Sequence, residues 1–280
     1  MKYRIEGTTK RYIGNNACAF DKFSPTDTES YQYGCEFEFY IDTDKYAYEE
    51  AILKITKELH LLSHADILVD TFALPMAKDK DFCLQVKPDN SLKSNGIEIS
   101  IPISTADGII HFIKTISPLI ERYGYTNEET GLHIHISSIK KDGVNFNFYK
   151  YMLICENANL LSSWKTRVGY SQNVMDILSM NNKLKSKQIK SKKGTVWNLE
   201  KIENNHVEIK TIGGNNYHHF VSKLISEFKE YSKYFHETLQ RDTIEHKELF
   251  RNHLAMVKSV GNQVQSRFDS ALVESGIKPK

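Results

Sequence analysis

The fold is decided by the stretch Tyr33-Gly34-Cys35-Glu36-Phe37-Glu38-Phe39-Tyr40-Ile41. Its odd-numbered residues are all apolar, whereas Glu36 and Glu38 stand at alternate positions between them. A period of two is typical of a β-strand with one buried face. The stretch therefore predicts a strand with an apolar core face and an acidic opposite face.

Three later stretches repeat this alternation, and each carries charged or imidazole side chains opposite its apolar positions. They are Ile97-Glu98-Ile99-Ser100-Ile101, Leu132-His133-Ile134-His135-Ile136-Ser137 and Val207-Glu208-Ile209-Lys210. We expect the polar sides of all four strands to form one surface, which would be the functional face of the sheet.

Apolar residues at three- and four-residue intervals predict helices over residues 45–62, 105–123 and 146–162. Two long helices are expected beyond residue 217, where they could pack as a helical hairpin. Because short polar turns also link strands, the predicted class is α+β, with a largely antiparallel sheet and helices on one side. The expected divisions are an N-terminal arm or edge strand (1–30), a main domain (31–216) and C-terminal helices on the same domain (217–280).

The composition limits the partners that this chain would attract. Its 280 residues contain 37 basic and 35 acidic side chains, a formal charge of +2, so a nucleic-acid partner is not favoured. No stretch has the roughly 18 apolar residues that span a bilayer, and the first residues do not resemble a signal peptide. We therefore expect a cytoplasmic protein without a membrane segment.

The polar face predicts a site for divalent metal ions. Carboxylates two positions apart on one strand lie about 7 Å from each other and repel unless a cation lies near them. An oxygen-rich set with a few imidazoles suits Mg²⁺ or Mn²⁺ better than zinc. A Glu-x-Glu pair alone is usually just solvated, but four carboxylates on three strands, with two histidines on a fourth, favour two ions, as in phosphoryl-transfer sites.

Together with Asp89-Asn90-Ser91-Leu92, these four stretches resemble the amidoligase family, whose members are relatives of glutamine synthetase and glutamate-cysteine ligase. The resemblance spans roughly residues 33 to 217. It implies a glutamine-synthetase-like, curved, mostly antiparallel sheet with helices on the convex face and with ATP and divalent metals on the concave face. It also implies an ATP-dependent ligase that joins a carboxylate and an amine, from small molecules or peptides, through an acyl phosphate.

The resemblance also implies roles for the acidic and imidazole residues. Glu36, His133 and Glu208 would bind the metal ion nearer the transferred phosphoryl group. Glu38 and Glu98 would bind the second ion.

Four further residues receive roles in the same way. His135 would contact nucleotide phosphate, and Arg167 would neutralise phosphate as a nucleotide-binding and catalytic residue. Lys210 would share that catalytic and nucleotide-binding place, where relatives commonly have arginine, but it lacks the planar two-pronged grip of a guanidinium group. Asp89 could orient Ser91 and its loop, or reach a metal ion through water.

Alternatives remain open at the level of sequence. The His-x-His strand could serve a metal-dependent hydrolase with a metal-bound water as nucleophile, and a non-catalytic binding protein could keep the same fold. The lysine-rich residues 183–193 indicate a solvated loop, or a flap that closes over triphosphate or grips an acidic or nucleic-acid substrate. His218 and His219 are expected to be surface or helix-cap residues rather than ligands.

Overall fold

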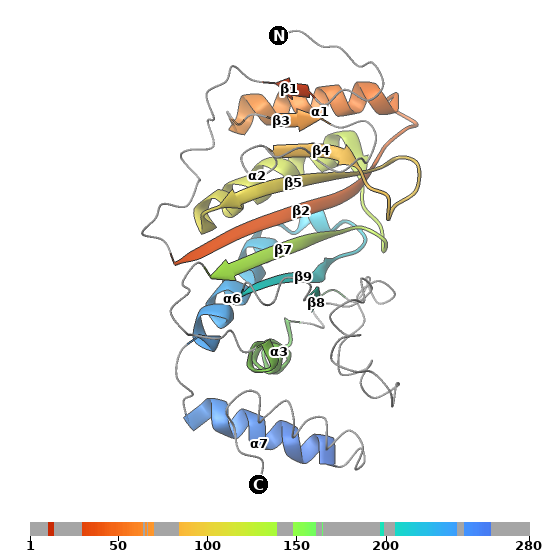
Figure 1. Ribbon diagram of the computed structural model, residues 1–280. Coiled ribbons are helices and arrows are strands. Elements are labelled where there is room, and N and C mark those ends of the chain that lie inside the picture. Colours follow the sequence, from red (N-terminus) through yellow and green to blue (C-terminus); the bar gives the residue numbers. More distant parts are fainter. Residues whose placement is uncertain are drawn as a thin grey trace.

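A computed structural model gives the structure of the chain (Figure 1). It describes residues 11–13, 30–63, 65, 67–69, 84–138, 148–160, 164, 197–198, 205–239 and 244–258. Arg167 and the lysine-rich residues 183–193 lie outside these ranges, so the predictions for them remain predictions.

The described residues form a nine-stranded sheet with the order β1-β3-β4-β5-β2-β7-β9-β8, and β6 pairs with β2 off this path. All pairings are antiparallel except that of β3 with β4. This confirms the mostly antiparallel sheet, and β1 is the edge strand expected near the N-terminus. The strands are β1 (Arg11–Ile13), β2 (Tyr31–Ile41), β3 (Ile67–Val69), β4 (Leu84–Pro88), β5 (Gly96–Ser104), β6 (Gly124–Tyr125), β7 (Gly131–Ser138), β8 (Trp197–Asn198) and β9 (His206–Gly213).

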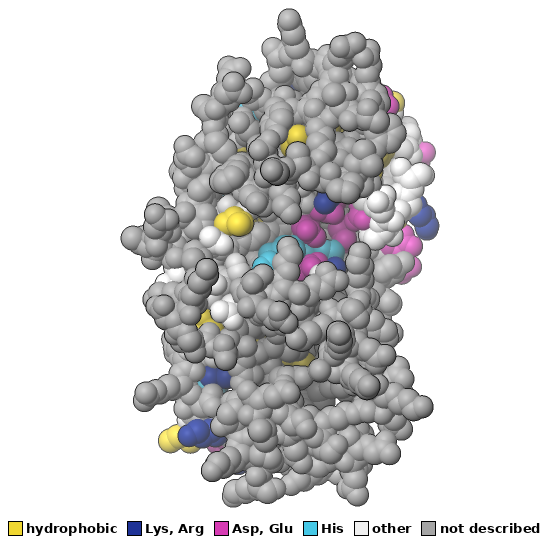
Figure 2. Space-filling model, viewed as in Figure 1, with side chains coloured by type: hydrophobic (Ala, Val, Ile, Leu, Met, Phe, Trp, Pro, Cys, Tyr) yellow, Lys and Arg dark blue, Asp and Glu magenta, His cyan; other side chains and the backbone are white. Residues whose placement is uncertain are grey.

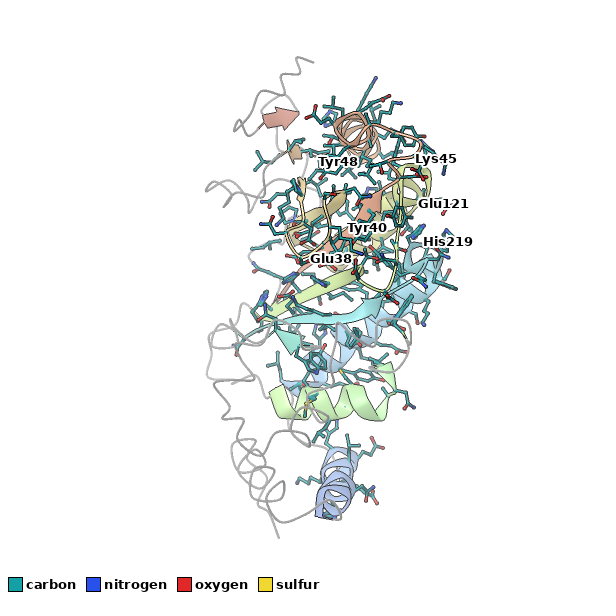
Figure 3. All side chains as sticks on the ribbon, turned by 90° about the vertical axis from the view of Figure 1, so that its right-hand side faces the viewer. Glu38, Tyr40, Lys45, Tyr48, Glu121 and His219 are labelled. Carbon is teal, nitrogen blue, oxygen red and sulfur yellow. The ribbon has the colours of Figure 1, made fainter. Side chains whose placement is uncertain are left out.

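Five α-helices and one 3₁₀ helix complete the described part, and together with the sheet they confirm an α+β fold. The helices are α1 (Tyr48–Ser63), α2 (Ala106–Tyr123), α3 (Phe148–Asn157), η6 (Tyr217–His219), α6 (Val221–Thr238) and α7 (Ile244–Lys258). Figures 1 and 3 show α2 and α6 against one face of the sheet, with α1 beside α2. None of the described helices is both long and apolar enough to span a bilayer.

The core lies between this sheet face and the helices. Phe37 and Ile134, on the central strands, are fully buried in one apolar cluster with Phe228 and Phe235 of α6. Since side chains alternate along a strand, burying these positions turns Glu36, Glu38 and their neighbours to the other face. The helix layer therefore decides which face of the sheet can be polar.

Within the described residues, which end at Lys258, α6 and α7 do not form the predicted hairpin. Instead, α3 packs against both α6 and α7, and it lies between them in Figure 1. The hairpin prediction was wrong because the apolar stripe of a helix reveals that a face is buried but not which element covers it.

Strand β9 contains an irregularity where it pairs with β7. Leu132 and Ile134 of β7 pair with Ile212 and Ile209, so one residue of β7 lies opposite two residues of β9. Such a bulge bends a strand and re-aims its side chains. Lys210 shares the polar face with Glu208 and pairs with it, as a period of two predicts, whereas the hydroxyl of Thr211 lies 2.7 Å from that of Tyr231 on the helix side.

Candidate metal centre

Acidic and imidazole side chains gather on the face of the sheet that the described helices leave uncovered. Figure 2 shows them as a contiguous patch of magenta and cyan. The strand register explains the grouping, because Glu38 pairs with Glu98, Glu36 with His133 and Glu208 with His135. The structure thus brings together the six predicted Glu and His residues of four strands, and with them Lys210.

Three carboxylates surround the ring of His133. Its Nδ1 atom lies 3.0 Å from Glu36 and 3.4 Å from Glu208, and its Nε2 atom lies 3.3 Å from Glu38. One imidazole can donate at most two hydrogen bonds. The ring can therefore donate to at most two of the three carboxylates around it.

His135 belongs to the same group. Its Nε2 atom lies 3.3 Å from Glu36, and potential ligand atoms of Glu36, His135 and Glu208 all lie within 4.8 Å of one another. Both histidines therefore contact the same carboxylate. The predicted division of roles, with His133 on the metal and His135 on nucleotide phosphate, stays a prediction.

Two lysines lie at opposite ends of this acidic group. Lys87 on β4 forms an ion pair with Glu98 at 2.9 Å, and Lys210 forms one with Glu208 at 2.8 Å. The hydroxyl of Ser100 donates to Glu98, and the amide of Asn198 donates to Glu208 at 2.6 Å. Both outer carboxylates are thus held in place by partners on neighbouring positions of the sheet.

Burial and neighbouring charges move the pKa values in different directions. Burial acts to raise the pKa of Glu36, but His135 and His133 outweigh it and hold that pKa well below its usual value. The pKa of Glu208 is likewise lowered by His135 and His133 against the effect of burial. Burial, followed by the charge of Glu36, raises the pKa of Glu98. The patch therefore combines strongly ionised carboxylates with one that resists ionisation.

Asp89 lies at the margin of the patch, on the turn after β4. The backbone N–H and the hydroxyl of Ser91 both donate to one carboxylate oxygen of Asp89 at 2.7 Å, as predicted for an orienting role. Its other oxygen, Oδ2, is buried and has no hydrogen-bond partner among the described residues. Burial and the nearby charge of Glu38 raise the pKa of Asp89. Asp89 is thus a fifth carboxyl group beside the site.

The sequence prediction missed three members of the patch. Lys87 follows an apolar–polar alternation over Leu84–Pro88 that could have revealed it. His206, whose Nε2 atom lies 3.3 Å from Nδ1 of His135, continues the alternation of β9 by two residues. Asn198 lies on a two-residue strand, which is too short to give any periodic signal.

A second group of possible ligands lies elsewhere. Glu121, His218 and His219 offer ligand atoms that lie within 4.8 Å of one another. The two histidines were expected to be surface or helix-cap residues. His219 is a surface residue, with 47% of its side chain exposed, but His218 is only 4% exposed and lies inside η6, so for His218 the expectation was wrong. His218 is buried where the short helix η6 packs against α2.

The sequence matches none of the protein-family models and none of the curated proteins with which it was compared.

Proposed function

We propose that this protein is an ATP- and divalent-metal-dependent ligase that joins a carboxylate to an amine. The observation that carries the proposal is the convergence of four glutamates and two histidines from β2, β5, β7 and β9 on one face of the sheet. In support, a mostly antiparallel sheet with helices on one face agrees with the glutamine-synthetase-like architecture that we propose for it.

The donor set fits divalent cations that prefer oxygen. Glu36, Glu38, Glu98 and Glu208 supply carboxylates. Among the described residues, Lys87 pairs with Glu98 and Lys210 pairs with Glu208. Glu38 and Glu98 are 5% and 8% exposed, and a buried carboxylate is stable only when countercharge lies close to it, which a bound cation would supply. Mg²⁺ or Mn²⁺ would be held by these four glutamates together with His133 or His135.

The chemistry of amide formation explains why such a site would need both metal ions and lysines. Bound Mg²⁺ or Mn²⁺ would neutralise the triphosphate and the substrate acid, which otherwise repel each other. Lys210 points toward the same face and would bind phosphate oxygens, a role shared with Arg167. The buried carboxylates fix the positions of their charges before substrate arrives, so little reorganisation is needed during the reaction.

The proposed reaction has two steps. An oxygen of the substrate carboxylate attacks the γ-phosphorus of ATP, the bond to the β-phosphate breaks, and ADP leaves with an acyl phosphate formed. The amine nitrogen then attacks the acyl carbon, loses a proton, and releases inorganic phosphate as the amide bond forms. Both steps need the acid, the triphosphate and the amine to lie together in one orientation.

Hydroxylamine offers a test that does not require the natural amine. The protein is incubated with ATP, Mn²⁺ and a panel of amino acids and peptides that carry carboxylates, and hydroxylamine traps an acyl phosphate as a stable hydroxamate. We expect hydroxamate and ADP to appear together for at least one acid. The Glu98→Gln variant should lose both products, whereas Glu128→Gln, an exposed glutamate on a turn, should keep them.

The other outcomes separate the rival functions. Hydrolysis of a peptide in the panel that needs metal but not ATP would identify a metal-dependent hydrolase. Binding of ATP and Mn²⁺ without turnover of any acid would identify a binding protein. Either result would overturn the ligase proposal.

A further inference from the structure

We propose that Glu121, His218 and His219 form a second metal site, separate from the acidic sheet face, that binds a transition-metal ion with Zn²⁺ as its preferred occupant. The site joins the last turn of α2 to the short helix η6. Figure 3 shows Glu121 and His219 close together on the helix side, apart from Glu38 on the sheet.

The local chain path explains how the three side chains meet. Gly213 and Gly214 both have positive φ angles, of 156° and 97°, and Asn216 is left-handed with a φ of 57°, so the chain turns sharply after β9. The turn places η6 beside the end of α2. The hydroxyl of Tyr217 then donates to the backbone carbonyl of Glu38 at 3.0 Å, which anchors η6 to the central strand.

The geometry directs both imidazoles at one carboxylate. Oε2 of Glu121 lies 3.1 Å from Nε2 of His218, and the same oxygen contacts Nε2 of His219. The two rings are 4.3 Å apart between centroids and lie at 65° to each other. Two Nε2 atoms and one carboxylate oxygen therefore converge on a small volume, as three ligands of one ion do.

A supporting hydrogen bond holds the buried ring. Nδ1 of His218 lies 3.1 Å from the hydroxyl of Thr126, which is itself buried. When the hydroxyl accepts from Nδ1–H, the lone pair of Nε2 is directed at the other two ligands. Metal-binding histidines commonly have their second nitrogen engaged in this way, because it fixes both the tautomer and the ring orientation.

The donor set distinguishes this site from the sheet face. Two imidazole nitrogens and one carboxylate are a ligand set of zinc sites that keep a fourth position for water. The side chains of Glu121 and His219 are 61% and 47% exposed, so an ion can enter from solvent and keep that water. Among the described residues, Lys45 is a cation that could compete for Glu121, but its ammonium pairs with Asp42 at 2.7 Å and the charge of Glu121 has only a small effect on its pKa.

Zinc titration of the whole chain tests the site. Because the sheet face could also take up zinc, the titration is made in the Glu36→Gln/Glu208→Gln double variant, and the bound zinc is counted by calorimetry. We expect one equivalent, with a rise in the melting temperature. Adding His219→Ala should weaken zinc binding by more than about tenfold, whereas adding His246→Ala, on the remote helix α7, should change it less than about twofold.

Cobalt gives an independent readout of the ligands. Co²⁺ bound by two nitrogens and one oxygen in a tetrahedral arrangement should give intense visible bands that His219→Ala removes. If the double variant does not fold, the wild-type chain is used, and His219→Ala should then lower its zinc stoichiometry by one. Absence of zinc binding, or binding that is unchanged in both His219→Ala and Glu121→Gln, would overturn this site and leave the ligase proposal standing.

Discussion

At the scale of single residues, Glu38 lies near two other carboxyl groups, those of Glu98 and Asp89. It lies directly opposite Glu98 in the β2–β5 register, and its charge helps to raise the pKa of Asp89. Directly opposed like charges destabilise a pair of strands. We therefore expect Glu38 and Glu98 to destabilise the metal-free chain and to favour the binding of a cation.

Glu38→Gln should separate these two effects. Without metal, the variant should unfold at a higher urea concentration, with a gain of about 0.5 to 1 kcal/mol, because one of the opposed charges is gone. Its affinity for Mn²⁺ should fall by at least about tenfold. Chemical unfolding with chelator and Mn²⁺ titration measure the two quantities, with Glu128→Gln as control, and a variant that loses stability would contradict the explanation.

Lys87 lowers the negative charge of the same surface. Because its ammonium pairs with Glu98 at 2.9 Å, it competes with any cation for that carboxylate. Lys87→Gln should therefore raise the affinity for Mn²⁺ by roughly three- to tenfold, equivalent to about 0.7 to 1.4 kcal/mol. Calorimetry measures the change, and Lys54→Gln, which removes an exposed ion pair with Glu50 on α1, is the matched control. A lower affinity would mean that Lys87 positions Glu98 for binding.

At the scale of elements, α6 is attached to β2 through a half-buried imidazole. His236 stacks on Tyr31 with ring centroids 3.7 Å apart, and its Nε2 atom lies 2.9 Å from the hydroxyl of Tyr33. Burial lowers the pKa of His236. In the unfolded chain, His236 takes up a proton at a higher pH of about 6.5. The neutral ring therefore makes its full contribution to the free energy of unfolding above that pH, and the contribution is lost as the pH falls.

The free energy of unfolding should therefore decline as the pH is lowered from about 7.5 to about 5, with a contribution from His236 of at most about 1.4 kcal/mol per pH unit. The His236→Gln variant should show a shallower decline than the wild-type chain. Urea unfolding at several pH values measures it, with His246→Gln as control. Parallel curves for the wild-type chain and His236→Gln would exclude this attachment as a source of the pH dependence.

The long elements were predictable because each has one buried face. Alternation over Tyr31–Ile41 and helical spacing over Ala106–Tyr123 are strong signals, and the predicted ends differ from the observed ones by only a few residues. The bulge in β9 was not predictable, since two residues opposing one is a property of the pair of strands. The placement of α3 between α6 and α7 depends on tertiary packing, which no single stretch encodes.

At the scale of the whole molecule, part of the polar side-chain clusters could also be predicted from the sequence and part could not. The Glu and His residues of the sheet face could be predicted, because one rule about buried faces applies to all four strands. The cluster of Glu121, His218 and His219 could not, since Glu121 is almost a hundred positions away from the histidines and meets them only when η6 packs on α2. Periodicity gives the direction of a side chain within its element, but not the partner that it meets.

Tyr217 connects the short helix η6 to strand β2. It is fully buried, and its hydroxyl donates to the backbone of Glu38 from the helix side of the sheet. Tyr217→Phe should lower the free energy of unfolding by about 0.5 to 1.5 kcal/mol, because one buried hydrogen bond is lost without a change in shape. Urea unfolding measures the loss, with Tyr125→Phe on the exposed strand β6 as control, and equal stability of the two variants would contradict the assigned role.

The fixed spacing of the strands should affect which divalent ion the sheet face prefers. Glu36, Glu38, Glu98 and Glu208 are attached to strands that backbone hydrogen bonds keep about 4.7 to 4.9 Å apart. Such a framework cannot widen by several tenths of an ångström on every side, as the change from Mg²⁺ at about 2.0 to 2.1 Å to Ca²⁺ at about 2.3 to 2.6 Å requires. At the proposed metal site, ionic radius should therefore govern selectivity, so that we expect Ca²⁺ to compete poorly for ligands whose positions the sheet backbone sets.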